Sequence, residues 1–200
     1  VYSIGGTDAE LFNVDASTGA VTFKTAPNFE VPTDSGTNNV YDIVVTASDG
    51  TLSATQAVAI TVTDVNEAPT VTSAATASFA ENGTGTAYTV TGTDPDASTT
   101  LVYSIGGTDA TLFNVNTSTG AVTFKTAPNF ESPTDSGTNN VYDLVVTASD
   151  GALSATQAVA ITVTNVNEAP TRANAIADQT TAEDAAFSFT VPANSFADVD

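Results

Sequence analysis

Two short polar segments hold the residues of this sequence that could do chemistry. Asp64, Asn66 and Glu67 end a β-branched run at residues 61–70, TVTDVNEAPT, and residues 162–171 repeat it as TVTNVNEAPT with one change. Their side chains all carry oxygen atoms, which are the ligands that a hard cation such as Ca²⁺ prefers. A strand can end on any turn residues, so the repeated ending is either a polar linker or half of a cation site.

The composition excludes several kinds of active site. The 200 residues include no Cys, His, Met or Trp, so the chain can form no disulfide, no zinc cluster of Cys and His, and no Ser-His-Asp triad. The formal net charge is −20, with 23 acidic residues against Lys24, Lys125 and Arg172. Such a chain should repel nucleic acid and anionic lipid and attract cations. No apolar run of about 18 residues is present, so we expect no membrane insertion.

An internal repeat is the strongest signal in the chain. Residues 1–70 and 102–171 align without gaps and differ at only seven positions, which include Ile43/Leu144 and Asp64/Asn165. The copies are offset by 101 residues. A unit of this length fits one β-sandwich module and is too long for one turn of a solenoid.

Apolar residues take every second position through most of the unit. Tyr41, Ile43 and Val45, for example, alternate with Asp42 and other residues of the opposite parity. Two-residue periodicity is typical of half-buried antiparallel strands, and Gly, Asn and Asp turns separate the runs. We expect seven strands in the complete unit, at residues 71–79, 86–92, 101–105, 112–116, 120–125, 140–148 and 155–164. The prediction is an all-β fold of tandem seven-stranded Greek-key (immunoglobulin-like) β-sandwich modules.

The repeat predicts three modules. Residues 1–66 would form a partial module with strands three to seven, residues 67–167 a complete module, and residues 168–200 the first strands of a third module. The chain begins on VYSIGG without Met, which is typical of a segment of a longer protein. Two explanations of the incomplete modules compete. Either the segment was cut from a longer array, or the tail at 168–200 of one chain completes the first module of the next, which would make a fibre.

Several short motifs resemble those of tandem cadherin-type repeats in very large bacterial surface proteins. The resemblance rests on TASDG at 46–50 and 147–151, DVNEAP at 64–69, AEN at 80–82, DPD at 94–96, and NFE at 28–30 and 129–131. It covers residues 1–170, and the C-terminal segment resembles a dystroglycan-type cadherin-like domain. NFE and NVNEAP differ from the family pattern because they place Asn where Asp is usual. The resemblance implies cadherin-like modules at an extracellular location on the cell surface.

The resemblance also implies Ca²⁺ sites where two modules meet. The first site would use Glu30, Asp64, Asn66, Glu67, Asp94, Asp96 and Asp150. The second would use Glu81, Glu131, Asn165, Asn167, Glu168, Asp198 and Asp200, and should bind more weakly because Asn165 has lost a charge. Clustered carboxylates repel one another, and a divalent cation reverses the sign of that interaction. The calcium ion would therefore lock the linker.

The alternative for any acidic turn is that it only keeps the chain soluble. We favour it for the four aspartates in GTD and TDSG turns, namely Asp8, Asp34, Asp109 and Asp135.

Three functions fit the sequence to different degrees. The favoured one is a calcium-stiffened structural or adhesive stalk or fibre segment of an extracellular bacterial surface protein. The alternative is a carbohydrate-binding accessory module of a secreted enzyme, and such a module needs an exposed aromatic platform. Most Tyr and Phe residues, however, take the inward parity of their strands, and only for Tyr2 and Tyr103 is the orientation undecided. The third function is a glycosidase with paired carboxylates. A catalytic centre is rarely copied almost intact along a chain, so the duplication argues against this function and we expect no enzyme. The expected partners are neighbouring cadherin-like modules, other copies of the chain in a fibre, and a cell-surface or glycan ligand.

Overall fold

The chain folds into two compact units. A computed structural model describes residues 1–200, and it groups Val1–Ala68 with Asp94–Thr99 in the first unit and Pro69–Thr93 with Thr100–Asp200 in the second. The predicted modules 1–66, 67–167 and 168–200 are defined by the sequence repeat, whereas the two units are defined by compactness. The module boundaries therefore stay a prediction. The only helical elements are two 3₁₀ turns, η1 (Ala9–Leu11) and η2 (Ala110–Leu112), so the structure contains no helix that could cross a membrane.

The first unit consists of two small antiparallel sheets. β1 (Tyr2–Gly5), β4 (Val40–Ser48) and β5 (Ser53–Thr61) form one sheet in the order β1-β4-β5, and β2 (Phe12–Val14) pairs with β3 (Val21–Phe23) in the other. The register places Tyr41 opposite Ile60 and Ile43 opposite Val58. Phe12, Tyr41 and Ile43 are buried between the sheets, with exposed fractions of 4% or less.

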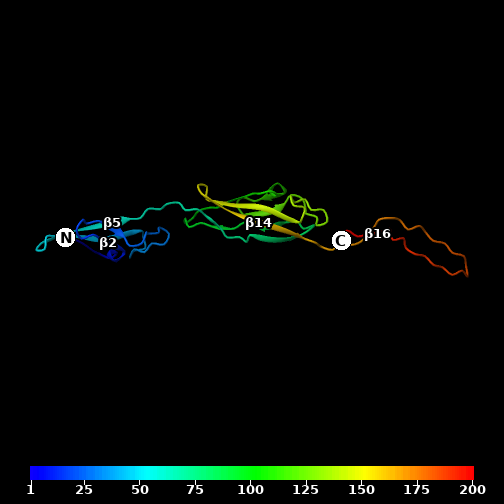
Figure 1. Ribbon diagram of the computed structural model, residues 1–200, viewed down its shortest axis with the longest axis horizontal. Coiled ribbons are helices and arrows are strands. Elements are labelled where there is room, and N and C mark those ends of the chain that lie inside the picture. Colours follow the sequence, from blue (N-terminus) through cyan, green and yellow to red (C-terminus); the bar gives the residue numbers. More distant parts are fainter. The chain divides into compact units, whose positions relative to one another are not determined.

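The second unit is a fuller version of the same two-layer arrangement. One layer has the order β10-β13-β14-β7, with β14 drawn in yellow in Figure 1, and the other has the order β11-β12-β8. A separate two-stranded sheet pairs β6 with β9. The strands are β6 (Thr70–Val71), β7 (Thr76–Ala80), β8 (Thr86–Thr89), β9 (Gly92–Thr93), β10 (Val102–Gly106), β11 (Phe113–Val115), β12 (Ala121–Phe124), β13 (Val141–Ser149) and β14 (Ser154–Thr164). The predicted all-β, immunoglobulin-like sandwich class is confirmed.

Two of the predicted strands are each broken in two, which corrects the sequence interpretation. The run 71–79 becomes β6, which pairs antiparallel with β9, and β7, which pairs parallel with β14. The run 86–92 becomes β8 and β9 in the same way. The Tyr88 hydroxyl donates to the carbonyl oxygen of Ala74 at 2.6 Å, at the break between β6 and β7. The first predicted strand therefore contributes to two different sheets, which an alternating pattern cannot reveal because the pattern is the same in both sheets.

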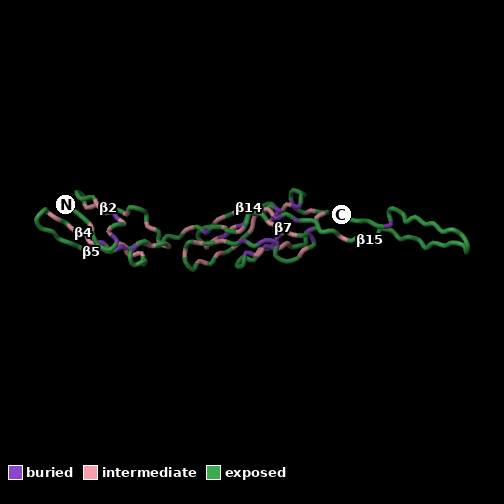
Figure 2. The backbone as a smooth tube through the Cα atoms, turned by 90° about the horizontal axis from the view of Figure 1, so that it is seen from below, coloured by how far each residue is buried: buried purple, intermediate pink, exposed green.

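The core of the second unit lies between its layers. Inward-facing residues of β13 and β14 fill it. Figure 2 shows buried segments (purple) along the strands near β7 and β14. Tyr142, Val146 and Ile161 have no exposed surface. The Phe113 and Phe124 rings pack with centroids 4.3 Å apart, and Tyr142 meets both rings edge-on. The predicted inward parity of these strands is confirmed.

The four aspartates of the GTD and TDSG turns are buried, with exposed fractions of 3% each, which corrects the expectation that they only keep the chain soluble. The Asp8 carboxylate accepts hydrogen bonds from the backbone N–H groups of Ser35 at 2.7 Å and Asp42 at 2.6 Å. Asp109 makes the equivalent pair in the second unit, and Asp34 and Asp135 each accept two N–H bonds from the turn that follows them. Because backbone donors satisfy these carboxylates, their role is to hold turns.

The C-terminal segment contains little regular structure. β15 (Thr171–Arg172) pairs with β16 (Phe196–Ala197), and the residues between them run out and back without strands (orange to red in Figure 1). Phe187 and Phe189 lie in this stretch with exposed fractions of 56% and 38%.

Candidate metal centres

The first candidate centre gathers four carboxylates from three loops. Glu30, Asp64, Glu67 and Asp96 each offer one oxygen, and these oxygens lie within 4.8 Å of one another. Asp64 and Glu67 follow β5, Glu30 lies between β3 and β4, and Asp96 follows β9. All four belong to the set that the sequence predicted.

Backbone hydrogen bonds hold these loops in place. The N–H of Glu67 donates to Oδ2 of Asp96 at 3.0 Å, and the N–H of Asp96 donates to Oδ1 of Asp94 at 2.9 Å. Asn28, which stands where the family pattern has Asp, accepts the N–H of Val31 at 2.8 Å. Its side chain therefore caps the turn that presents Glu30.

Several oxygens of the first centre are buried without a partner. Oε1 of Glu30, Oε2 of Glu67 and Oδ2 of Asp94 are inaccessible to solvent and accept no hydrogen bond. A buried charged oxygen without a partner destabilises the fold. Burial, followed by repulsion from Glu30, Asp96 and Asp64, raises the pKa of Glu67. A divalent cation would supply the missing partner, so the donor set fits Ca²⁺.

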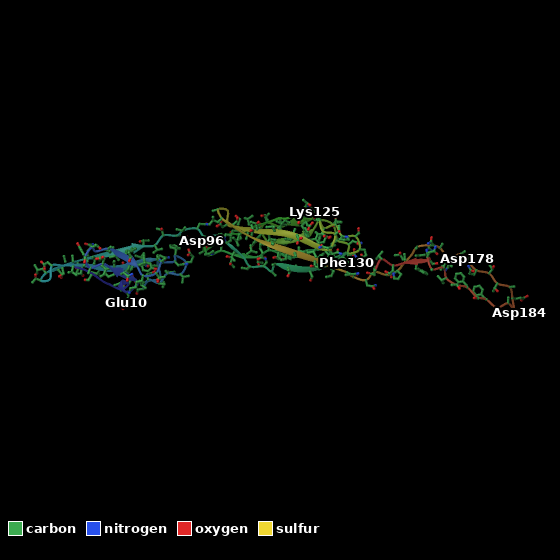
Figure 3. The ribbon with its side chains drawn as sticks, in the orientation of Figure 1. Glu10, Asp96, Lys125, Phe130, Asp178 and Asp184 are labelled. Atoms are coloured by element: carbon green, nitrogen blue, oxygen red, sulfur yellow. The ribbon has the colours of Figure 1, made fainter.

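The second candidate centre is built around Glu81. One oxygen each of Glu81, Glu131 and Glu168 lies within 4.8 Å of the others. Glu81 is only 2% exposed, and its two oxygens accept the N–H groups of Phe130 and Val166, each at 2.8 Å. These two bonds lower the pKa of Glu81, so its carboxylate stays ionised although it is buried. Phe130 is labelled in Figure 3, where the strands of the second unit give way to its C-terminal segment.

Glu168 is the counterpart in the second centre of Glu67 in the first, with an equivalent backbone hydrogen bond and an equivalent buried oxygen. Its N–H donates to Oδ2 of Asp200 at 2.7 Å, and its Oε2 is buried without a partner. Burial, followed by repulsion from Glu81, Asp200 and Glu131, raises the pKa of Glu168. The other oxygen, Oε1, accepts a hydrogen bond from the Asn82 side-chain amide at 2.7 Å.

The remaining predicted ligands lie close to the two centres in sequence. The Asn66 and Asn167 side chains donate to the carbonyl oxygens of Glu67 and Glu168, at 3.1 Å and 2.9 Å. Asp198 accepts the N–H of Asp200 at 3.3 Å, as Asp94 does for Asp96 in the first centre.

Two further predicted ligands occupy exposed or turn positions. Asn165 is exposed and puts a neutral amide where the first copy has Asp64. Asp150 lies in the β13–β14 turn of the second unit, where its Oδ1 accepts the N–H groups of Ala152 and Leu153. The roles of both positions as metal ligands stay predictions, as do those of the other predicted ligands.

Sequence reasoning missed the role of Asn82. The motif AEN at 80–82 contains it, but only Glu81 was singled out there as a ligand. No local signal could have found the contact, because Asn82 and Glu168 are separated by 86 residues.

Comparison with solved structures identifies a cadherin-like fold. The chain resembles human Protocadherin-24 EC1-2 with a TM-score of 0.57 and 22% identity, over 82% of this chain and 81% of that one. Mouse Cadherin-23 EC22-24 gives 0.58 and 24%, over 82% and 52%, and Drosophila N-cadherin EC1-4 gives 0.57 and 24%, over 82% and 41%. The chain therefore spans about half or less of the latter two structures. No protein-family model matches the chain, and no curated protein matches it in sequence.

Proposed function

We propose that this chain is a calcium-stiffened structural or adhesive segment of an extracellular bacterial surface protein. One observation carries the proposal: four carboxylates converge within 4.8 Å on the linker that follows β5, and oxygens of Glu30 and Glu67 are buried there without a partner. The cadherin-like fold and the motif resemblance support the same reading. The partners in this proposal are neighbouring cadherin-like modules and other copies of the chain, with a cell-surface or glycan ligand.

The carboxylates of the first centre would act together as ligands. Ca²⁺ takes six to eight oxygens at about 2.3–2.6 Å, and Glu30, Asp64, Glu67 and Asp96 offer that chemistry from separate loops. Glu67 and Asp64 belong to the linker, whereas Asp96 belongs to the loop after β9. Holding these carboxylates together orders the linker, because their mutual repulsion otherwise favours separation.

The expected energy is small, as suits a linker. Extracellular calcium modules bind with Kd near 10⁻⁴–10⁻³ M, so millimolar calcium would add on the order of 0.4–1.4 kcal/mol at each centre. Such a free energy changes global folding little, but it is enough to order a short connecting segment.

The proposal is tested by calcium titration of the whole chain. Calorimetry in calcium-depleted buffer should give binding at millimolar or tighter affinity, and calcium should slow proteolytic cleavage within residues 64–68. Glu67→Gln should weaken the binding, because it removes one charge from the cluster. Glu10→Gln is the matched control, since Glu10 is exposed and lies away from Asp96 in Figure 3. A parent chain that binds no calcium, or a Glu10→Gln effect as large as that of Glu67→Gln, would contradict the proposal.

No structural observation favours the carbohydrate-binding alternative in the two repeats. Phe12, Tyr41, Phe113 and Tyr142 are buried, and Tyr103 packs partly buried against the second core. Only Tyr2, which is 39% exposed, offers an aromatic surface at these positions. Specific binding on a glycan array that Tyr2→Ala abolishes would revive the alternative.

A further inference from the structure

One contact of the second centre is made by a neutral amide side chain, that of Asn82, rather than by a carboxylate. The Asn82 side-chain nitrogen donates to Oε1 of Glu168 at 2.7 Å, and it bridges the loop after β7 to the linker after β14. A charge-assisted hydrogen bond of this length is among the stronger polar contacts in proteins. It leaves Oε2 of Glu168 as the oxygen without a protein partner.

The backbone fixes the Asn82 side chain in place. Asn82 has a φ of +57°, its N–H donates to the carbonyl oxygen of Pro128 at 2.8 Å, and the N–H of Gly83 donates to that of Ala80 at 3.3 Å. Asn tolerates this left-handed conformation better than most residues. The neighbouring Glu81 is bound to Phe130 and Val166, so the whole loop is tied down.

The same turn returns in the C-terminal segment with a different side chain. Asp184 also has a φ of +57°, and the N–H of Ala185 donates to the carbonyl oxygen of Ala182 at 3.4 Å. The turn geometry therefore does not require the contact with Glu168. The Asn82 amide has a role beyond shaping its turn.

We propose that Asn82 is a positioning residue of the second centre, which holds Oε1 of Glu168 so that Oε2 is left for a cation. This inference rests on the proposed calcium function. Asn82 adds no charge, but it assembles the linker end of the centre before a cation arrives. It thereby compensates in part for Asn165, which replaces the linker aspartate of the first centre.

The experiment compares the parent chain with Asn82→Gly. Glycine accepts the φ of +57° and removes only the side-chain donor. Asp184→Gly is the matched control, because it makes the same change in the same turn at an exposed position. Calcium titration followed by NMR separates the centres, with the Glu67 amide signal reporting the first and the Glu168 amide signal reporting the second.

Asn82→Gly should weaken calcium binding at the second centre about three- to tenfold, the range expected for loss of one solvent-exposed hydrogen bond. Binding at the first centre should stay unchanged, and Asp184→Gly should change neither. In calcium-depleted buffer, hydrogen exchange at the Glu168 N–H should accelerate in Asn82→Gly, while the Val166 N–H, which Glu81 holds, keeps its protection.

Two outcomes would overturn the inference without touching the proposed function. One is an Asn82→Gly chain that binds calcium at the second centre as tightly as the parent. The other is unchanged exchange at the Glu168 N–H, which counts against the positioning role whether or not calcium binds. Failure of the parent chain to bind calcium at either centre would instead overturn the proposed function.

Discussion

The backbone N–H of Glu67 donates to Oδ2 of Asp96 at 3.0 Å, across 29 residues of sequence. Glu168 and Asp200 repeat the bond at 2.7 Å, across 32 residues. In each case a linker residue binds the loop that follows a short strand pair, β6-β9 or β15-β16. The two candidate centres therefore share the same hydrogen bond between linker and loop, which forms without a metal ion, and they differ in the side chains that the linker and loop present.

Removing the charge of Asp96 should weaken calcium binding at the first centre by about tenfold or more, because one of four clustered carboxylates is lost. Asp96→Asn keeps an oxygen that can accept the Glu67 N–H, so the framework should survive. Asp42→Asn removes one charge from an exposed position of the same unit and serves as the control. Calorimetry on the three chains checks the prediction, which fails if the two variants lose affinity equally.

Exchanging the linker residues at positions 64 and 165 together should exchange the ranking of the two centres. Asn165→Asp restores the charge that the second copy lacks and should tighten the second centre, whereas Asp64→Asn should weaken the first. The reason is the charge count at each linker, since the flanking residues are identical in both copies. NMR-detected calcium titration measures each centre separately. Equal affinities in the parent chain would refute the ranking.

The stability of the calcium-free protein should fall as the pH rises above the usual glutamate pKa of 4.5. Burial and neighbouring carboxylates raise the pKa of Glu67 and Glu168 in the folded state, so the folded state binds more protons than the unfolded chain in that window. Repulsion from Glu30, Asp64 and Asp96 acts on Glu67, and repulsion from Glu81, Glu131 and Asp200 acts on Glu168. Stability is therefore lost with rising pH through these raised pKa values.

Glu81 acts in the opposite direction below that window. Its pKa is lowered by the N–H groups of Phe130 and Val166, so its contribution to stability is lost as the pH falls below 4.5. Thermal unfolding over a pH series, with and without calcium, measures both effects. Saturating calcium should remove the loss at higher pH, and an identical decline in both series would contradict the assignment.

The core position shared by Ile43 and Leu144 should tolerate exchange but not truncation. Both side chains are 2% exposed at equivalent places in the two copies. Leu144→Ala should cost about 2–5 kcal/mol, because it removes buried contacts and leaves a cavity. Leu144→Ile, which restores the residue of the first copy, should cost less than about 1.5 kcal/mol. Chemical denaturation followed by a probe in the second unit measures both, and equal losses would show that the site does not pack as described.

Much of the architecture follows from local pattern. The alternation around Tyr142 and Leu144 determined which side of β13 faces the core, because side chains of a strand point alternately to its two faces. The polar segments that end the last strand of each repeat predicted that Glu67 and Glu168 would lie where the chain leaves the sandwich. The break between β6 and β7 and the Asn82–Glu168 contact could not be read in this way. Both depend on partners far away in the sequence.

Val21 and Val122 separate what sequence determines from what tertiary structure decides. Both lie in the same local sequence, TGAVTFK, and both face inward from the same strand of the repeat. Val122 has no exposed surface, because β8 pairs with β12 and places Tyr88 opposite it, whereas Val21 on β3 pairs only with β2 and is partly exposed. The side chain and its parity are fixed by the residue and its neighbours in the chain. Its burial depends on the surface that other strands bring to it, since water is excluded only where a second apolar surface covers the first.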